Sequence, residues 1–243
     1  MKNNHWLSPE WPAPANIHAA TTLRTGGVSL APYNSLNPAS HVGDNAEHVR
    51  ENRQRIKSLL KLPAEPLWLQ QTHSNQAVYA QANSITAIAD ASYTDQANVV
   101  CAVMTADCLP LLVCSADGLQ IAAIHAGWRG LLDGIISNTI GCFATKDLLV
   151  WLGPAIGKHC FEVGQDVYSA FAEKSAVFSS AFTASANDKY LADIYQLARI
   201  ELQALGIKQI YGGDFCTVTD SDRFFSYRRD QQTGRMATLI WRD

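Results

Sequence analysis

Apolar positions recur at helical spacing in three segments of the chain. The segments 46–61 (AEHVRENRQRIKSLLK) and 165–173 (QDVYSAFAE) both show this spacing. A third segment, 190–205, gathers its apolar residues on one side of a helix, namely Leu191, Ile194, Leu197, Ala198 and Leu202. A surface helix of a globular protein turns one apolar stripe toward the core. We therefore expect helices over these three segments, placed in outer layers.

Short apolar runs with the length of β-strands lie between and around these segments. Several are apolar at every position, which is typical of strands covered on both faces. The pattern predicts an α+β fold, a layered sandwich of mixed β-sheets flanked by helices. Since no long linker divides the chain, we expect one domain over residues 1–243. The predicted strands are 66–70, 76–80, 98–104, 109–114, 119–124, 148–153, 210–213 and 235–241.

Two of these runs, LPLLVC and LQIAAI, are joined by SADG, and this turn predicts an antiparallel hairpin. If Cys114 faces Leu119 across the turn, then Cys108 faces His125 at the open end of the hairpin. Directly opposed residues have Cβ atoms about 4.5–5.5 Å apart, so the two side chains would lie together. Such a pair is often simple packing, because cysteine is among the most buried residue types.

The residues around the pair favour a chemical site over simple packing. After His125 the sequence AGWRG leads into a segment with helical spacing at 131–143, which predicts a glycine-bounded turn and a helix. A helix N-terminus presents unpaired amides to an anion, and Arg129 adds a cationic donor there. Asp107, His125 and Arg129 thus converge where apolar strands end, a common place for a site.

Composition and charge exclude several classes of protein. Hydrophobic residues make up 47% of the chain and charged residues 17%, which is the balance of an ordered globular protein. The net charge of -3 and the lack of a basic run argue against a nucleic-acid partner. No signal-like or membrane-spanning apolar stretch is present, so we expect a cytoplasmic protein with no membrane partner. The six cysteines form no C-x-x-C, which favours reduced thiols over a structural zinc knuckle.

Several motifs, taken in order, resemble those of a known family. The sequence resembles the YfiH-like family, also called laccase-domain or polyphenol oxidase proteins, and within it most nearly the bacterial members that edit peptidoglycan. The similarity runs almost from end to end. The motifs that carry it are TLRTGGVS (22–29), SLN (35–37), HVGD (41–44), QQTHS (70–74), TADCLP (105–110), HAGWRG (125–130), LGPAIG (152–157), FEVG (161–164) and SYRRD (226–230).

The resemblance implies a sandwich of mixed sheets between helical layers, with a zinc ion held by His73, Cys108 and His125. Three protein ligands leave a fourth tetrahedral position open, as in catalytic zinc sites. The implied activities are adenosine deamination and the phosphorolysis of adenosine, inosine and methylthioadenosine. The substrates would then be small molecules, a purine nucleoside and phosphate.

Other residues receive roles from the same comparison combined with their chemistry. Arg24 and Arg129 are candidates for phosphate binding, because cationic donors bind phosphate oxygens well. His41 is a weaker candidate for substrate binding. Asp107 is a candidate acid or base, and an equally good candidate for orienting a ligand or bracing the turn. Trp128 could stack on a base or belong to the core.

Three alternatives stay open at this point. Cys108 as a nucleophile and His125 as its base would make an amide hydrolase, which could remove misincorporated serine from a cytoplasmic muropeptide precursor. A polyphenol oxidase with copper is a second alternative, although no two of the seven histidines form the His-x-His motif of multicopper laccases. A non-catalytic interaction protein that retains an old pocket is the third.

Overall fold

The computed structural model describes residues 5–82, 84 and 86–243. Two sheets form its centre, one with the strand order β1-β2-β13-β5 and one with the order β12-β8-β6-β7-β4-β3. Their strands are β1 (Trp6–Leu7), β2 (Ile17–Thr22), β3 (Ala77–Tyr79), β4 (Ala91–Thr94), β5 (Cys101–Thr105), β6 (Leu109–Ser115), β7 (Ile121–Ala126), β8 (Leu148–Leu152), β12 (Gln209–Gly212) and β13 (Met236–Arg242).

A small third sheet with the order β10-β11-β9 and several helices surround this centre. The small sheet consists of β9 (Glu162–Gly164), β10 (Phe182–Ala184) and β11 (Lys189–Ala192). The helices are α1 (Ala46–Leu60), α2 (Trp128–Leu132), α3 (Ile135–Ile140), α4 (Gln165–Lys174), α5 (Ile194–Ala204) and α6 (Tyr227–Asp230), with a 3-10 turn at Ala176–Ala181.

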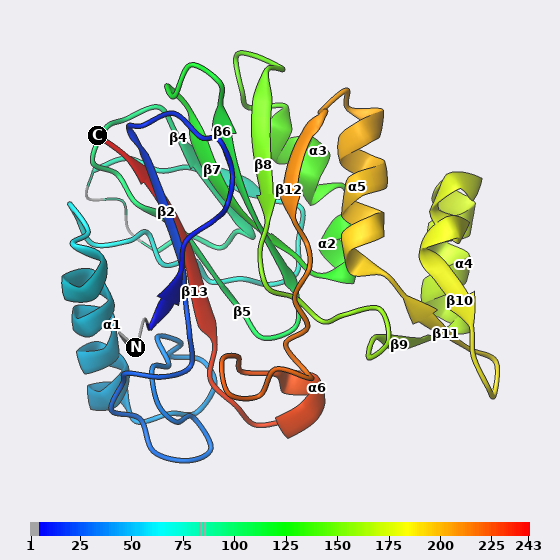
Figure 1. Ribbon diagram of the computed structural model, residues 1–243, viewed down its shortest axis with the longest axis horizontal. Helices are drawn as coiled ribbons and strands as arrows, with labels where there is room; N and C mark the ends of the chain where they lie inside the picture. The colour runs from blue at the N-terminus through cyan, green and yellow to red at the C-terminus, as the bar shows by residue number, and fades with distance from the viewer. Residues whose placement is uncertain (1–4, 83, 85) are drawn as a thin grey trace.

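The two large sheets pack face to face between helical layers (Figure 1). Successive side chains of a strand point to opposite faces, and both faces of β6 are buried. Leu111 and Val113 pack toward α3 and α5, whereas Leu112 and Cys114 pack toward the four-stranded sheet. The helix α1 covers the outer face of that sheet. The predicted α+β layered sandwich of mixed sheets is thus confirmed, since the six-stranded sheet contains parallel and antiparallel pairs.

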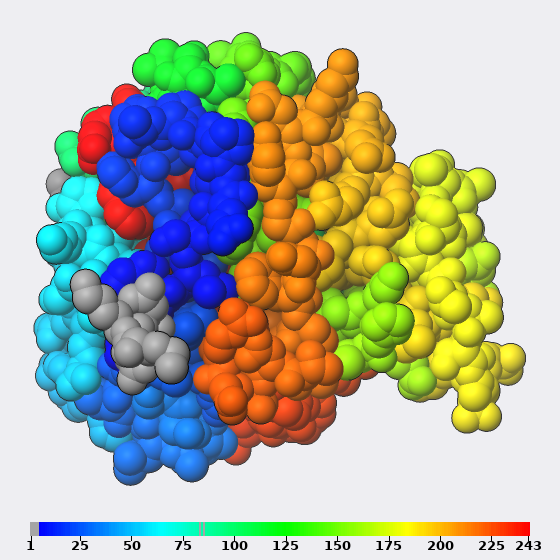
Figure 2. Space-filling view, viewed as in Figure 1, coloured from blue at the N-terminus to red at the C-terminus, as the bar shows by residue number. Residues whose placement is uncertain are grey.

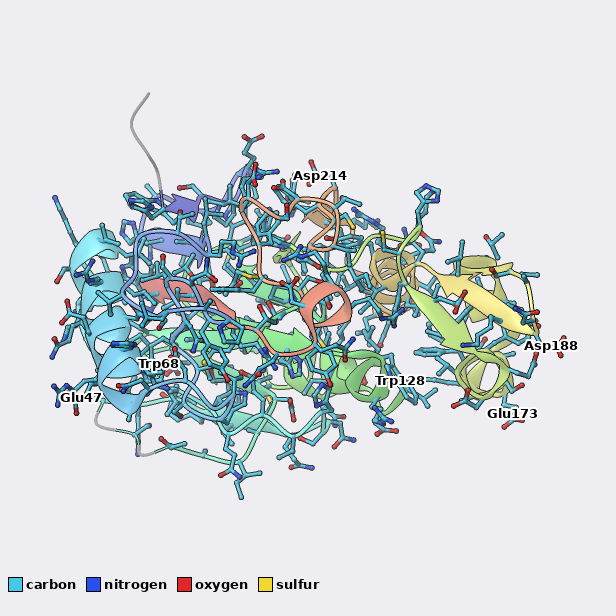
Figure 3. The ribbon with its side chains drawn as sticks, turned by 90° about the horizontal axis from the view of Figure 1, so that it is seen from below. Glu47, Trp68, Trp128, Glu173, Asp188 and Asp214 are labelled. Carbon is cyan, nitrogen blue, oxygen red and sulfur yellow. The ribbon has the colours of Figure 1, made fainter. Side chains whose placement is uncertain are left out.

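The small sheet and α4 project from one side of the molecule as a lobe (Figure 2). Seen from below, Glu47 of α1 and Asp188 of the lobe lie at opposite ends, and Trp128 lies between the central sheets and the lobe (Figure 3). Among the described residues, no helix has both the length and the apolar character that crossing a membrane requires.

The hairpin of β6 and β7 forms as predicted, but its register differs by two residues. Cys114 pairs with Ile121 instead of Leu119, and His125 pairs with Pro110. The turn is longer than the sequence indicates because the Ser115 hydroxyl accepts the backbone N–H groups of Leu119 and Gln120. A shift by two residues keeps every side chain on its expected face, whereas a shift by one would reverse it.

Three other predicted elements have different limits. Residues 66–70 contribute only isolated bridges, at Leu67 and Gln70. The predicted helix 190–205 begins as strand β11, and Asp193 caps the helix α5 that follows. The predicted helix 131–143 is divided into α2 and α3 at Gly134, whose φ of 84° lies in the left-handed region that glycine adopts readily.

All six cysteines are free thiols, as expected for a reduced protein. Cys101 and Cys114 are fully buried between the two large sheets. Burial raises the pKa of both thiols to about 12, because the charged form loses its solvation. These two cysteines are therefore packing residues, in contrast to Cys108.

Candidate metal centre

His73, Cys108 and His125 come together from three segments at one end of the two large sheets. His73 lies on the loop before β3, Cys108 directly precedes β6, and His125 lies in β7. One donor atom from each lies within 4.8 Å of the others, and Cys108 Sγ is 3.7 Å from His73 Nε2. The predicted juxtaposition of the three side chains is confirmed. In the described part of the chain, this is the one cluster of His, Cys, Asp or Glu side chains that could share an ion.

Asp90 orients this group and is the functional residue that the sequence reasoning missed. Its side chain is fully buried, and Oδ1 lies 2.7 Å from Nδ1 of His125. A carboxylate on one ring nitrogen fixes the orientation of the imidazole and leaves Nε2 for the metal. Burial opposes ionisation of Asp90, but hydrogen bonds from His125 and Ser74 outweigh it and lower its pKa well below the usual range.

The same carboxylate holds the loop that carries His73. Asp90 accepts the backbone N–H groups of Thr72, His73 and Ser74 at 3.2, 3.0 and 2.6 Å, as well as the hydroxyl of Ser74 at 2.6 Å. His73 has a φ of 62°, a conformation that non-glycine residues seldom adopt. One buried carboxylate therefore positions two of the three candidate ligands. The sequence signal for it is an aspartate inside the otherwise apolar stretch AIADA, where a charge needs a partner.

The surroundings of Cys108 and His125 favour the thiolate of the one and the imidazolium of the other. Burial disfavours the thiolate, but the charge of His125 and hydrogen bonds from both histidines lower the pKa of Cys108 to about 6. Burial likewise disfavours the imidazolium, but Cys108 and Asp90 raise the pKa of His125 to about 9. The thiolate is the form of cysteine that binds a metal or acts as a nucleophile.

Gly127 keeps the space beside the three side chains open. A Cβ atom at this position would lie 2.8 Å from Cδ2 of His73 and 3.2 Å from Sγ of Cys108. The first distance is shorter than van der Waals contact, so a larger residue would displace the histidine. The glycine that follows His-Ala in the HAGWRG motif is thus required by close approach.

Asp107 braces the loop beside the group. Its φ is 88°, Oδ1 accepts the Thr217 hydroxyl at 2.6 Å, and Oδ2 accepts the backbone N–H of Arg228 at 2.6 Å. Both carboxylate oxygens are therefore engaged in tying the Cys108 loop to two distant segments. This observation supports the bracing role considered for Asp107, while a catalytic role stays a prediction.

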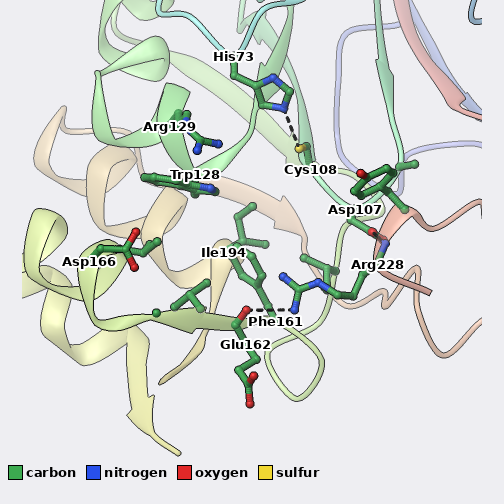
Figure 4. A pocket seen from close by; sticks show the side chains of 16 residues that line it. His73, Asp107, Cys108, Trp128, Arg129, Phe161, Glu162, Asp166, Ile194 and Arg228 are labelled. Atoms are coloured by element: carbon green, nitrogen blue, oxygen red, sulfur yellow. Dashed lines mark hydrogen bonds between the residues drawn. The ribbon is translucent and has the colours of Figure 1, made fainter. Parts of the chain in front are cut away.

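A chamber of about 400 Å³, the large chamber, opens beside His73 and Cys108 (Figure 4). Its walls are mainly apolar and include Trp128, Phe161 and Ile194, and charged residues lie around them. Arg129 is exposed and its guanidinium lies over the Trp128 ring, 4.3 Å from the centroid. Both residues lie in the short helix α2, which forms part of the chamber wall. The charged lining residues are Asp107, Arg129, Glu162, Asp166 and Arg228.

A second chamber of about 290 Å³, the small chamber, is lined by all three candidate ligands. Its lining includes the predicted substrate residue His41, together with Arg235, which the sequence reasoning did not single out. Both chambers share His73, Ala106, Cys108 and Tyr227 as lining residues.

Arg24 lies outside the lining of both chambers. Its guanidinium donates to the carbonyl oxygens of Asn34 and Ser221, and it lies over the Phe225 ring at 5.0 Å. These contacts join three loops, so the structure gives Arg24 a packing role. Its predicted part in phosphate binding stays a prediction.

Comparisons with known proteins agree with the motifs. A family model described as multi-copper polyphenol oxidoreductase laccase matches residues 18–243. The purine nucleoside phosphorylase YfiH of Shigella flexneri is 52% identical over 238 residues, which cover 97% of this chain and 98% of that protein. The crystal structure of Neisseria meningitidis protein NMB0706 is similar with a TM-score of 0.95 and 48% identity, covering 99% of this chain and 100% of that one.

A more distant structure shows the same architecture. The crystal structure of YlmD from Geobacillus stearothermophilus is similar with a TM-score of 0.91 and 30% identity, covering 100% of this chain and 97% of that one. The family model, the relatives and the solved structures thus all align with nearly the whole chain. The chain therefore belongs to the YfiH-like family of multi-copper polyphenol oxidoreductase laccase proteins.

Proposed function

We propose that the chain is a zinc-dependent purine nucleoside phosphorylase with His73, Cys108 and His125 as the metal ligands. The observation that carries the proposal is the three-donor group, two members of which, His73 and Cys108, line a mainly apolar chamber that includes Trp128 and Phe161. The name of the Shigella flexneri relative, at 52% identity, supports the same activity. We infer that adenosine, inosine and methylthioadenosine are substrates, and that adenosine is also deaminated at this site.

The donor set fits zinc. Two imidazole nitrogens and a thiolate are ligands that zinc prefers, and three protein ligands leave one position for a reactant. The ionised Cys108 and the orientation of His125 by Asp90 prepare the group for a cation. When bound, zinc supplies Lewis-acid stabilisation of negative charge that develops on oxygen.

The protein residues bind and orient the nucleoside. The flat Trp128 and Phe161 rings offer apolar faces for a purine base. In phosphorolysis a phosphate oxygen forms a bond to C1′ of the ribose, and the bond from C1′ to N9 breaks. The purine leaves with that electron pair and takes the proton of monohydrogen phosphate, so ribose 1-phosphate and the free base result. Holding the two reactants together lowers the entropic part of the barrier.

A Cys/His amide hydrolase is the second candidate, and one arrangement favours it. Cys108, His125 and Asp90 stand in the order nucleophile, base and carboxylate, and Asp90 holds the base as in other hydrolases. Such an enzyme would act on a muropeptide precursor. The copper oxidase alternative gains no such support, because the described residues contain a single three-donor group.

Zinc content and turnover of three alanine variants test the proposal. His73→Ala, Cys108→Ala and His125→Ala should each lose bound zinc and inosine phosphorolysis together, because all three hold one ion. His159→Ala and Cys142→Ala, outside the cluster, are matched controls that should keep both. Circular dichroism checks folding.

The variants also separate the two candidate functions. If folded, metal-free His73→Ala retains full activity while Cys108→Ala is inactive, the thiol hydrolase replaces the zinc enzyme. An acyl group trapped on Cys108 would lead to the same conclusion.

A further inference from the structure

The small chamber differs from the large chamber in its charges. Among the residues that the structure describes, no carboxylate lines it, and its charged or ionisable lining residues other than Tyr227 are Arg235, His41 and the three candidate ligands. The large chamber, in contrast, has acidic as well as basic residues in its lining. Cys108 and His125 stand next to each other in this lining, whereas Arg235 has no carboxylate beside it in the described part of the chain, and an unpaired guanidinium attracts an anion.

Arg235 lies at this place because of strand pairing. Met236 begins β13 and pairs with Thr105 at the end of β5, so Arg235 stands beyond the sheet edge near the loop that carries Cys108. The backbone N–H of Arg235 donates to Oδ1 of Asn37 at 3.0 Å, which ties it to the loop that carries His41. Segments far apart in the sequence are thereby brought to one cavity.

The Arg235 guanidinium uses only some of its N–H donors within the protein. Nη1 donates to the carbonyl oxygens of Thr233 and Gly234, both at 3.0 Å. Within the described ranges, Arg235 forms no ion pair with a carboxylate, although it is half-buried. Arg229 and Arg223, by comparison, each contact a neighbouring aspartate. A guanidinium that no carboxylate neutralises is a suitable group for binding an oxyanion, which it can do through two parallel N–H groups.

We infer that the small chamber is the phosphate subsite, with Arg235 and His41 as its anion-binding residues. The inference rests on the proposed phosphorylase function and locates its second substrate. The volume of about 290 Å³ holds a tetrahedral oxyanion with water but lies below the range of about 300–1,000 Å³ for sites of larger ligands. The nucleoside then occupies the large chamber, and the two reactants meet at the shared residues His73 and Cys108.

The geometry favours Arg235 over the two arginines selected from the sequence. Arg24 donates to backbone carbonyls outside both chambers. Arg129 is exposed and lies over Trp128 at the wall of the large chamber. Neither residue lines the small chamber.

Steady-state kinetics of the zinc-loaded protein test the inference. Arg235→Gln should raise the KM for inorganic phosphate by about 10- to 100-fold, because charge-assisted hydrogen bonds are lost. The KM for inosine should stay within about twofold. Arg235→Lys, which retains the charge but not the paired donors, should give an intermediate value. Arg50→Ala on the exposed face of α1 is the control and should match the wild type.

Calorimetry with inorganic phosphate alone separates this inference from the proposed function. If the wild type does not cleave inosine but binds phosphate, and Arg235→Gln does not bind it, the phosphorylase function fails and the subsite stands. If the wild type and Arg235→Gln bind phosphate equally, or the wild type binds none, the inference is overturned. His41→Asn changes an exposed side chain and serves as a second variant if Arg235→Gln fails to fold, with a several-fold weaker phosphate binding expected. Ribose 1-phosphate should compete with inorganic phosphate for the wild type, because its phosphate group would occupy the same subsite. Its binding, like that of inorganic phosphate, should be weaker for Arg235→Gln.

Discussion

Replacing Asp90 by asparagine should weaken zinc binding and folding together. The two carboxylate oxygens have different partners. Oδ1 accepts Nδ1 of His125 and the N–H of His73, whereas Oδ2 accepts the N–H groups of Thr72 and Ser74 and the Ser74 hydroxyl. Asparagine has one acceptor oxygen and one NH₂ donor. It can therefore serve one set of partners and must turn its NH₂ group toward the other.

Each orientation of the amide has a definite cost. If the NH₂ group faces His125, it also faces the backbone N–H of His73, which then loses its acceptor. Nδ1 of His125 must act as acceptor in this orientation, and the proton moves to Nε2, the nitrogen that is meant to bind the metal. If it faces Thr72 and Ser74, their two backbone N–H groups lose their acceptor. A buried unsatisfied donor costs about 1–3 kcal/mol, so two cost about 2–6 kcal/mol of folding stability. Loss of a carboxylate behind a metal-binding histidine lowers metal affinity by about 10- to 100-fold.

Chelator competition measures the zinc affinity of Asp90→Asn, and urea unfolding of the metal-free protein measures its stability. Asp188→Asn makes the same chemical change on the lobe, at the far end from the metal centre, and should alter neither quantity (Figure 3). A zinc affinity of Asp90→Asn equal to that of the wild type would refute the orienting role of Asp90. Normal stability with weak zinc binding would refute its role in holding the His73 loop.

Four further measurements test other parts of the structure. Zinc binding at about pH 7 should release about one proton, because Cys108 (pKa about 6) is already ionised and His125 (pKa about 9) must lose its proton. Calorimetry in buffers of different ionisation enthalpy measures the number of protons released, and release of two protons would contradict the ionised state of Cys108. The zinc affinity should therefore fall as the pH drops below about 9 and fall more steeply below about 6, where Cys108 is protonated as well, and a pH-independent affinity would contradict this. Gly127→Ala should reduce zinc occupancy because its Cβ would lie 2.8 Å from Cδ2 of His73. An unchanged zinc content would show that the His73 loop can move to accept the methyl group, against this prediction. Burial raises the pKa of Glu201 in the folded protein, so the wild type loses folding stability as the pH rises from the unfolded pKa through the folded pKa. Glutamine does not ionise, so the stability of Glu201→Gln relative to the wild type in urea unfolding should increase from about pH 4 to pH 8. A constant difference would contradict the raised pKa.

Local patterns in the sequence determined much of the layered fold. The helical spacing at 46–61 and the cap at Asn45 are local properties, and α1 forms there. The turn residues between the runs 109–114 and 119–124 place two strands side by side, so the approach of Cys108 to His125 was predictable. The register was two residues off because a serine hydroxyl, not the turn dipeptide alone, decides the turn length.

The tertiary structure decided which distant groups meet. Asp90 reaches His125 and the His73 loop because β4 pairs with β7, and Arg235 reaches the metal centre because β13 pairs with β5. Residues 190–192 extend the small sheet instead of α5 because β11 finds partners in β9 and β10. The spacing of apolar residues records which face of an element is buried, but not which remote strand covers it. The roles of the buried Asp90 carboxylate and of Arg235 could therefore be inferred only once these strand pairings were known.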